Sequence, residues 1–211
     1  MAAFGTVFMP KMALATFEDN SWSASSIVAS DKLEIHPGAH VLHYSSTCFE
    51  GLKAFKHKDG SVNIFRMDAN IQRMSQSSDL LSLPEINKDQ LAQMIKDVVS
   101  LYADDVPSPP GSMYIRPTQI GTEAAIGKAA VPSESSLLYV LLSPVGDYFT
   151  GGAKPLRLLL EEEGMRCAPH MGMIKSGGNY ASALGPISRA RKECDADQIL
   201  FCPNGDVQET G

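Results

Sequence analysis

The chain has 211 residues, enough for one large domain or two small ones, and its 18 Lys and Arg against 24 Asp and Glu give a formal net charge of −6. An acidic balance argues against a nucleic-acid-binding protein, because such proteins normally carry a basic excess. The composition, 44% hydrophobic and 20% charged, is that of a folded domain, and the longest apolar run, residues 137–142, is too short to span a membrane.

The first half of the chain alternates predicted strands and helices. The expected strands are residues 12–17, 26–30, 51–57 and 62–65. The last two flank Asp59-Gly60, a strong signal for a hairpin turn. Apolar residues at helical spacing predict helices over residues 68–81 and 88–102, the second with Asn87 as its N-cap.

The second half continues the pattern. The expected strands are residues 112–118, ended by Gly121, and residues 136–143, 156–160 and 198–202. The all-apolar run in 136–143 implies burial on both faces of that strand. A helix is expected over residues 179–192, bent at Gly185-Pro186.

A turn-rich stretch predicts where the chain divides. We expect a small α/β domain over residues 1–143, an interdomain loop over 144–152 and the start of a larger domain over 153–211. The final residues begin a strand that has no obvious partner, which leaves the strands of the second domain with open edges. We interpret the chain as the N-terminal part of a longer protein rather than as one that ends in a loose tail.

The N-terminus and the cysteines indicate a cytoplasmic protein. The opening residues lack the basic stretch and apolar core of a signal peptide. No CxxC pair or metal-like spacing occurs, which predicts reduced, mostly buried thiols at Cys48, Cys167, Cys194 and Cys202. His36, His40 and His43 lack Cys or carboxylate partners at a metal-ligand spacing, so we expect no metal.

Arg66 is the first candidate for binding a ligand. It follows Val62 and Ile64 at a period of two, which predicts that the three side chains share one strand face. An arginine on a core-facing row needs an anion or a paired acid. Arg66 is therefore either an exposed strand end or a site that binds a phosphate or carboxylate.

Tyr114 and Arg116 form a second candidate. They share one face of a predicted strand, while Met113 and Ile115 share the other. A phenol beside a guanidinium is a good receptor for a carboxylate. The pattern equally allows an ordinary exposed sheet face.

Lys175 lies in the most informative stretch of the sequence. It precedes Gly177 and Gly178 and the predicted start of a helix, and glycines let a backbone approach a ligand closely. Such a lysine can form a Schiff base if its pKa is depressed. The order of residues does not match a phosphate-binding loop, and a solvated loop lysine is the alternative.

Five blocks in order resemble the branched-chain amino-acid aminotransferases. They are His43-Tyr44 with residues 49–55, Phe65-Arg66 with Asn70 and Arg73-Met74, residues 114–117, residues 175–181, and Glu209-Thr210-Gly211. The resemblance implies fold type IV, an α/β class with a small α/β domain, a connecting loop and a larger domain built on a pseudobarrel. It also implies pyridoxal 5'-phosphate as cofactor, transfer of amino groups between Leu, Ile or Val and 2-oxoglutarate, and a homodimer.

The resemblance also implies roles for individual residues. Lys175 matches the lysine that binds the cofactor covalently and then moves the substrate proton. Tyr180 matches the tyrosine that hydrogen-bonds the cofactor's phenolic oxygen, and Glu209 matches the carboxylate that pairs with its ring nitrogen. Arg66 matches an arginine that binds the cofactor's phosphate. Tyr44, Phe49, Tyr114 and Tyr148 match the walls of the side-chain pocket, and Arg116 matches the receptor for the distal carboxylate of glutamate.

Three alternatives remain at this point. A D-amino-acid aminotransferase or an aminodeoxychorismate lyase would use the same fold, and a non-catalytic truncated product would at most bind a partner subunit. The family continues beyond the Glu-Thr-Gly block with residues that contact the cofactor phosphate and the substrate α-carboxylate. We therefore expect an incomplete site in these 211 residues.

Overall fold

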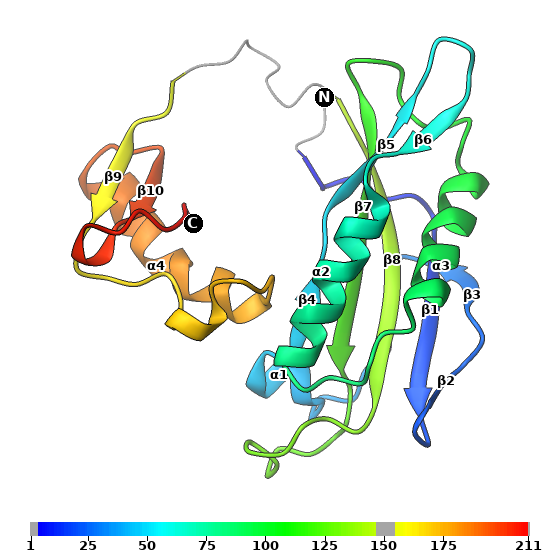
Figure 1. Cartoon of the computed structure of the whole chain (residues 1–211), viewed down its shortest axis with the longest axis horizontal. Helices are drawn as coiled ribbons and strands as arrows, with labels where there is room; N and C mark the ends of the chain where they lie inside the picture. Colours follow the sequence, from blue (N-terminus) through cyan, green and yellow to red (C-terminus); the bar gives the residue numbers. More distant parts are fainter. Residues whose placement is uncertain (1–3, 147–154, 211) are drawn as a thin grey trace. The chain divides into compact units, whose positions relative to one another are not determined.

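The computed structural model describes residues 4–146 and 155–210, and the chain divides into two compact units, Met1–Thr150 and Gly151–Gly211 (Figure 1). Each unit has its own hydrophobic core, one on the sheet of the first unit and a smaller one around a helix of the second. None of the helices in the described part of the chain is long and apolar enough to cross a membrane.

The first unit is built on an eight-stranded sheet in the order β2-β1-β8-β7-β5-β6, with β3 also paired to β1 and β4 to β7. Its strands are β1 (Lys11–Glu18), β2 (Ser21–Trp22), β3 (Ser26–Ala29), β4 (Thr47–Phe49), β5 (Leu52–Lys56), β6 (Val62–Ile64), β7 (Ser112–Gly121) and β8 (Ser136–Val145). All of these pairings are antiparallel. The long pair β7–β8 forms the centre, and it carries the strand on which Tyr114 and Arg116 lie.

Helices α2 (Met67–Leu80) and α3 (Lys88–Leu101) cover one face of this sheet, and α1 (His40–Tyr44) is a short helix before β4 (Figure 1). Apolar side chains fill the space between helices and sheet, among them Met74, Leu91, Met94, Met113 and Ile115. Burying these side chains is worth about 1.5–3 kcal/mol each. The opposite face of the sheet is thereby left to carry polar and aromatic groups.

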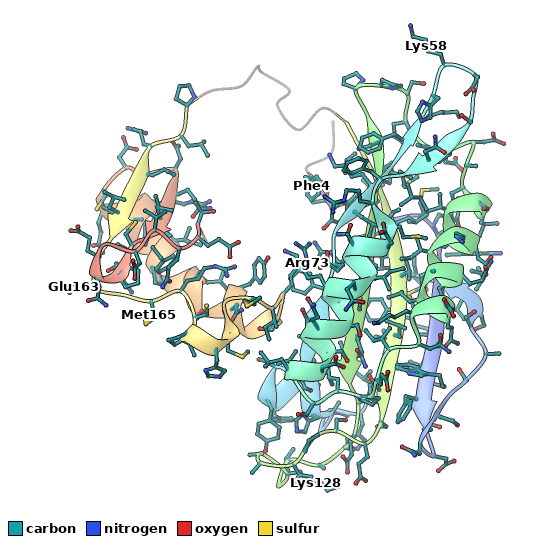
Figure 2. All side chains as sticks on the ribbon, in the orientation of Figure 1. Phe4, Lys58, Arg73, Lys128, Glu163 and Met165 are labelled. Carbon is teal, nitrogen blue, oxygen red and sulfur yellow. The ribbon has the colours of Figure 1, made fainter. Side chains whose placement is uncertain are left out.

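Several sequence predictions in this unit are confirmed. β5 and β6 form the hairpin around Asp59-Gly60, and Lys58 projects at its tip (Figure 2). The Asn87 side chain accepts a hydrogen bond of 3.0 Å from the Gln90 backbone and so caps α3. Met113 and Ile115 are buried, whereas Tyr114 and Arg116 are partly exposed on the other face.

Two predictions about side-chain direction are wrong. Arg66 does not continue a strand: β6 ends at Ile64, and Arg66 takes a left-handed backbone conformation (φ 49°) as the residue before α2. Its turn ends the period-two alternation, and the side chain is exposed. In β8, burial alternates along the strand, with Leu138, Val140 and Leu142 buried and the residues between them only half-buried, because helices cover one face alone.

The second unit contains β9 (Leu158–Glu161), α4 (Gly177–Glu193) and β10 (Gln198–Phe201), with short 3-10 turns at Pro169–Met171 and Pro203–Gly205. β9 and β10 pair in parallel, and α4 packs on β10 through Ala183, Ala190, Ile199 and Phe201. This is a strand–helix–strand unit, since parallel neighbours require a long crossover. The helix begins two residues before its predicted start and continues through Pro186.

The prediction of partnerless strands at the end of the chain is also wrong. β9 and β10 pair with each other, and the residues after the final turn return along β10. Phe201 donates to the Glu209 carbonyl at 3.1 Å, Gln208 donates to the Phe201 carbonyl at 2.9 Å, and Thr210 bridges to Leu200. The turn at residues 203–206 folds the chain back on itself, which a local pattern does not reveal. Glu209 is thereby held beside β10.

Candidate active site

In the first unit, three of the predicted substrate residues meet on the face of the sheet away from the helices. Arg116 donates two hydrogen bonds to the Tyr114 hydroxyl, from Nε at 3.2 Å and from Nη2 at 2.7 Å. Its guanidinium carbon lies 4.6 Å from the centroid of the Phe49 ring. The phenol and the aromatic ring hold the cation in place without neutralising it, which suits it to receive an anion.

Gly51 is required beside Tyr114. A Cβ atom on Gly51 would lie 2.2 Å from the Tyr114 hydroxyl oxygen and 2.9 Å from the ring carbon that bears it. Only a residue without a side chain therefore fits between β4 and β5 at this point. The glycine of the Phe-Glu-Gly block sets the position of Tyr114.

Glu50 connects the turn between β4 and β5 to helix α2. Its carboxylate is buried (1% exposed) and accepts hydrogen bonds from Arg73 at 2.5 and 2.7 Å and from Asn70 at 2.9 Å. Burial alone would raise the pKa of Glu50, but the bonds from Arg73 and Asn70 outweigh it and hold the pKa below its usual value. Sequence reasoning assigned no role to Glu50, although Asn70 and Arg73 are spaced to share one helix face.

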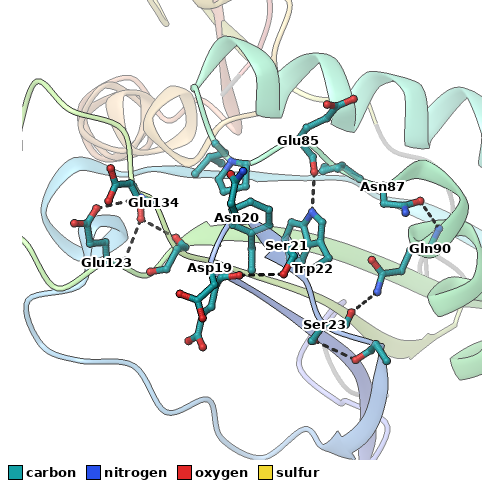
Figure 3. Close-up of a pocket in the computed structure, with 18 of the residues that line it drawn as sticks. Asp19, Asn20, Ser21, Trp22, Ser23, Glu85, Asn87, Gln90, Glu123 and Glu134 are labelled. Carbon is teal, nitrogen blue, oxygen red and sulfur yellow. Dashed lines mark hydrogen bonds between the residues drawn. The ribbon is translucent and has the colours of Figure 1, made fainter.

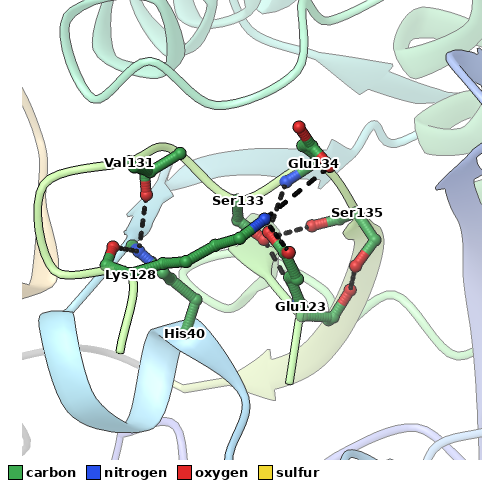
Figure 4. Close-up of polar contacts among 8 residues, drawn as sticks. His40, Glu123, Lys128, Val131, Ser133, Glu134 and Ser135 are labelled. Carbon is green, nitrogen blue, oxygen red and sulfur yellow. Dashed lines mark hydrogen bonds and ion pairs between the residues drawn. The ribbon is translucent and has the colours of Figure 1, made fainter. Parts of the chain in front are cut away.

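Tyr44 lies in a different part of the first unit. Its hydroxyl donates to the Ile126 carbonyl, and its ring lies 4.8 Å from that of His40. Buried His40 bonds to Ser46 at 2.9 Å through Nδ1. Its Nε2 contacts the Val131 carbonyl at 3.2 Å (Figure 4). Together these contacts hold the loop between β7 and β8 against α1.

An ion pair also stabilises the loop between β7 and β8. Lys128 donates to Glu123 at 2.5 Å, and this hydrogen bond lowers the pKa of the Glu123 carboxyl (Figure 4). The neighbouring histidines have protein partners as well, since His43 contacts the Pro37 carbonyl at 3.0 Å and His36 accepts from the Gly38 amide at 2.9 Å. No cluster of three potential metal ligands occurs among residues 4–146 and 155–210.

In the second unit, Lys175 and Tyr180 are in contact. Lys175 precedes α4 and Tyr180 lies in the first turn of that helix. The Lys175 ammonium donates to the Tyr180 hydroxyl and lies 4.9 Å from the centroid of its ring. Buried Asn179 donates to the carbonyls of Met171 at 2.8 Å and Ile174 at 3.1 Å, which fixes the loop that carries Lys175.

Glu209 joins this group through a residue that the sequence reasoning missed. Arg166 donates to Glu209 at 3.0 Å, and its guanidinium carbon lies 4.8 Å from the centroid of the Tyr180 ring. The contacts therefore run from Lys175 to Tyr180, to Arg166 and to Glu209. Arg166 lies in a loop without periodicity, so no signal in the sequence singled it out.

Two predicted residues remain, Arg66 and Tyr148. Arg66 is exposed at the start of α2 and is not among the contacts of the Phe49, Tyr114 and Arg116 group of its own unit, and Tyr148 lies outside the described residues. A large cavity of about 1650 Å³ lies in the first unit between the β1–β2 turn, residues 82–90 and the end of the β7–β8 loop (Figure 3). Its lining includes none of the predicted site residues, and Trp22 donates to the Glu85 carbonyl across it at 2.7 Å.

Comparison with curated proteins supports the resemblance seen in the sequence. No protein-family model matches the chain. The chain is 38% identical over 196 residues to the branched-chain-amino-acid aminotransferase of Dictyostelium discoideum, covering 92% of this chain and 51% of that protein. It is 39% identical to branched-chain-amino-acid aminotransferase 2 of Bacillus subtilis (94% and 55% covered) and 40% identical to the cytosolic enzyme of Ovis aries (99% and 55% covered). The chain thus spans about half the length of the curated relatives it matches.

Solved structures share the fold. The branched-chain aminotransferase of Thermoproteus uzoniensis, crystallised with norvaline, matches with a TM-score of 0.72 at 19% identity, covering 95% of this chain and 63% of that one. The enzyme from Thermobaculum terrenum, crystallised in its PLP form, matches with a TM-score of 0.69 at 18% identity, covering 92% and 59%. The predicted fold class, the mixed α/β arrangement of fold type IV, is confirmed.

Proposed function

We propose that this chain is part of a pyridoxal 5'-phosphate-dependent branched-chain aminotransferase, which moves amino groups between Leu, Ile or Val and 2-oxoglutarate. The observation that carries the proposal is the contact between Lys175 and Tyr180 at the start of α4, in a chain that is similar to such enzymes over nearly its whole length. The Lys175 amine bonds to the Tyr180 phenol, and Arg166 contacts both Tyr180 and the Glu209 carboxylate. A lysine amine is the group that forms a Schiff base with this cofactor.

The residues of the second unit fit the cofactor. Lys175 supplies the primary amine for a covalent bond, Tyr180 would donate to the cofactor's phenolic oxygen, and Glu209 would bond to its ring nitrogen. Arg66 of the first unit would bind the phosphate, and its exposed guanidinium is available to an anion. When bound, pyridoxal phosphate supplies an electron sink for the negative charge that forms at the substrate Cα.

Lys175 would then act as the acid–base group. Its Nζ would accept the proton from the substrate Cα and hold it close to the bound cofactor. Tyr180 would orient that amine, because the two side chains are already hydrogen-bonded. Glu209 would keep the ring nitrogen protonated, since a carboxylate close to it favours the charged form.

The first unit would supply the substrate pocket. Tyr44, Phe49, Tyr114 and Tyr148 would form its apolar walls, and Arg116 would receive the distal carboxylate of glutamate or 2-oxoglutarate. Arg116 can serve both substrates, because in the absence of a carboxylate its charge is stabilised by Tyr114 and Phe49. One pocket could in this way accept an aliphatic side chain and an acidic one in turn.

The biological setting is part of the proposal. We infer a cytoplasmic homodimer in amino-acid biosynthesis, with a small domain at residues 1–143, an interdomain loop at 144–152 and a cofactor-binding domain that begins at 153. Size measurement of the purified protein by light scattering tests the dimer. A monomer at working concentration would contradict it.

Two measurements on the full-length protein test the function. A visible absorption band after addition of pyridoxal phosphate separates an aminotransferase from a non-catalytic product. A screen of amino donors then separates the same-fold candidates: Leu, Ile and Val should react, whereas preference for D-alanine or conversion of aminodeoxychorismate would contradict the proposal.

A further inference from the structure

Arg166 is a buried cation between two proposed cofactor ligands. It lies in the loop after β9, and only 4% of its side chain is exposed. The Ser182 hydroxyl on α4 donates to the Arg166 carbonyl, which fixes the backbone of the loop against the helix. The backbone of Arg166 is therefore fixed, and its side chain is buried within the second unit.

The contacts of the guanidinium are few for a buried charge. It pairs with Glu209 at 3.0 Å and stacks on the Tyr180 ring at 4.8 Å. Its Nε atom has no hydrogen-bond partner within the described part of the chain. Burying a charge with incomplete hydrogen bonding opposes folding, and an apolar residue of similar volume would often stabilise the core more. A role in folding alone therefore accounts poorly for Arg166.

We propose that Arg166 is a positioning residue that holds Glu209 and Tyr180 in place on behalf of the cofactor. The inference rests on the proposed function, since it takes Glu209 as the partner of the ring nitrogen and Tyr180 as the partner of the phenolic oxygen. Arg166 binds Oε2 of Glu209, which leaves Oε1 for the ring nitrogen. The guanidinium thereby links the two side chains that would hold the cofactor ring.

Two effects of Arg166 oppose each other, and their sizes decide the expected result. The cation competes with the cofactor for the negative charge of Glu209, but Glu209 is 58% exposed, so solvent weakens this competition. Without Arg166 the Glu209 side chain must be ordered when the cofactor binds, which is a substantial cost for a flexible carboxylate. Loss of Arg166 should consequently weaken cofactor binding.

The test is a double-mutant cycle in the full-length protein with Arg166→Met, Glu209→Gln and the double variant. The readouts are the release rate of pyridoxal phosphate and the pH dependence of its visible absorption. Arg166→Met should speed release roughly tenfold and displace the pH profile toward that of Glu209→Gln. In the Glu209→Gln background, Arg166→Met should change both readouts less than it does in the wild-type background, because the part of its effect that passes through Glu209 is gone and only the contact with Tyr180 remains to be lost.

Two further variants guard against a general loss of structure. Arg157→Met removes an exposed arginine of the same unit that pairs with Asp195, and its release rate and pH profile should match the wild type. If Arg166→Met does not fold, Arg166→Lys takes its place, because it keeps the positive charge. It should release the cofactor severalfold faster than the wild type, because one ammonium cannot both stack on Tyr180 and pair with Glu209.

The outcomes separate this inference from the proposed function. If the wild-type protein binds no pyridoxal phosphate, both are wrong. If it binds the cofactor but the effects of Arg166→Met and Glu209→Gln are additive, or Arg166→Lys behaves as the wild type, the positioning role alone is wrong.

Discussion

At the residue scale, the candidate site depends on close approaches between residues far apart in the sequence. A period of two correctly predicts that Tyr114 and Arg116 share a face, but not that Gly51 makes room for the Tyr114 hydroxyl. Arg166 is a similar case, because its ion pair with Glu209 exists only once the chain has turned back along β10. Local patterns predict the direction of a side chain, and only the fold supplies its partners.

Arg116 should discriminate between the two substrate classes. Arg116→Leu removes a charge-assisted contact, so kcat/KM for glutamate should fall roughly 30- to 150-fold, with a much smaller loss for leucine. Tyr114→Phe is the matched control, since it removes the hydroxyl that accepts from Arg116 but keeps the cation. Steady-state kinetics with both donors measure the effect, and an equal loss for glutamate and leucine would assign Arg116 a structural role.

Gly51 should be essential for the position of Tyr114. Gly51→Ala puts a methyl group within 2.2 Å of the Tyr114 hydroxyl, so the ring must move and KM for amino acids should rise roughly tenfold. Adding Tyr114→Phe removes the closest atom and should recover part of the loss. Gly127→Ala, at a site with no atom within 4 Å, is the control. An unchanged KM in Gly51→Ala would show that the turn adapts without cost.

At the scale of elements, prediction succeeds where a signal is local. The Asp59-Gly60 hairpin and the Asn87 cap follow from residues within a few positions of one another, and both are present. It fails where the chain changes direction. Arg66 continues the alternation of β6 in sequence but turns into α2, and the final strand segment finds its partner in β10 only through the turn at residues 203–206.

The link between the β4–β5 turn and α2 should depend on pH. The pKa of Glu50 lies below its usual 4.5, so its stabilising effect is present above that value and is lost as the pH falls through the lowered pKa. Glu50→Gln should therefore lower the free energy of unfolding by about 2 kcal/mol at pH 7 and by less at pH 3. Urea unfolding at several pH values measures this, with exposed Glu85→Gln as the control. A pH-independent difference would contradict the ionic role of Glu50.

At the scale of the whole molecule, the two groups of candidate residues lie in two units with separate cores. The first unit holds the Phe49, Tyr114 and Arg116 cluster that would recognise the substrate. The second holds Lys175, Tyr180, Arg166 and Glu209, which would hold the cofactor. Composition and periodicity predicted an α/β chain with a boundary, but neither indicates the chemistry. That came from the resemblance of short blocks, which the comparisons over 92–99% of the chain support.

The central claim is that Lys175 binds pyridoxal phosphate covalently, and chemical labelling tests it most directly. The full-length protein is incubated with pyridoxal phosphate, reduced with borohydride to trap the bond, digested and mapped by mass spectrometry. We predict a single phosphopyridoxyl label on Lys175, which disappears together with nearly all turnover in Lys175→Ala. A label on another lysine, or full labelling and activity in Lys175→Ala, would contradict the account.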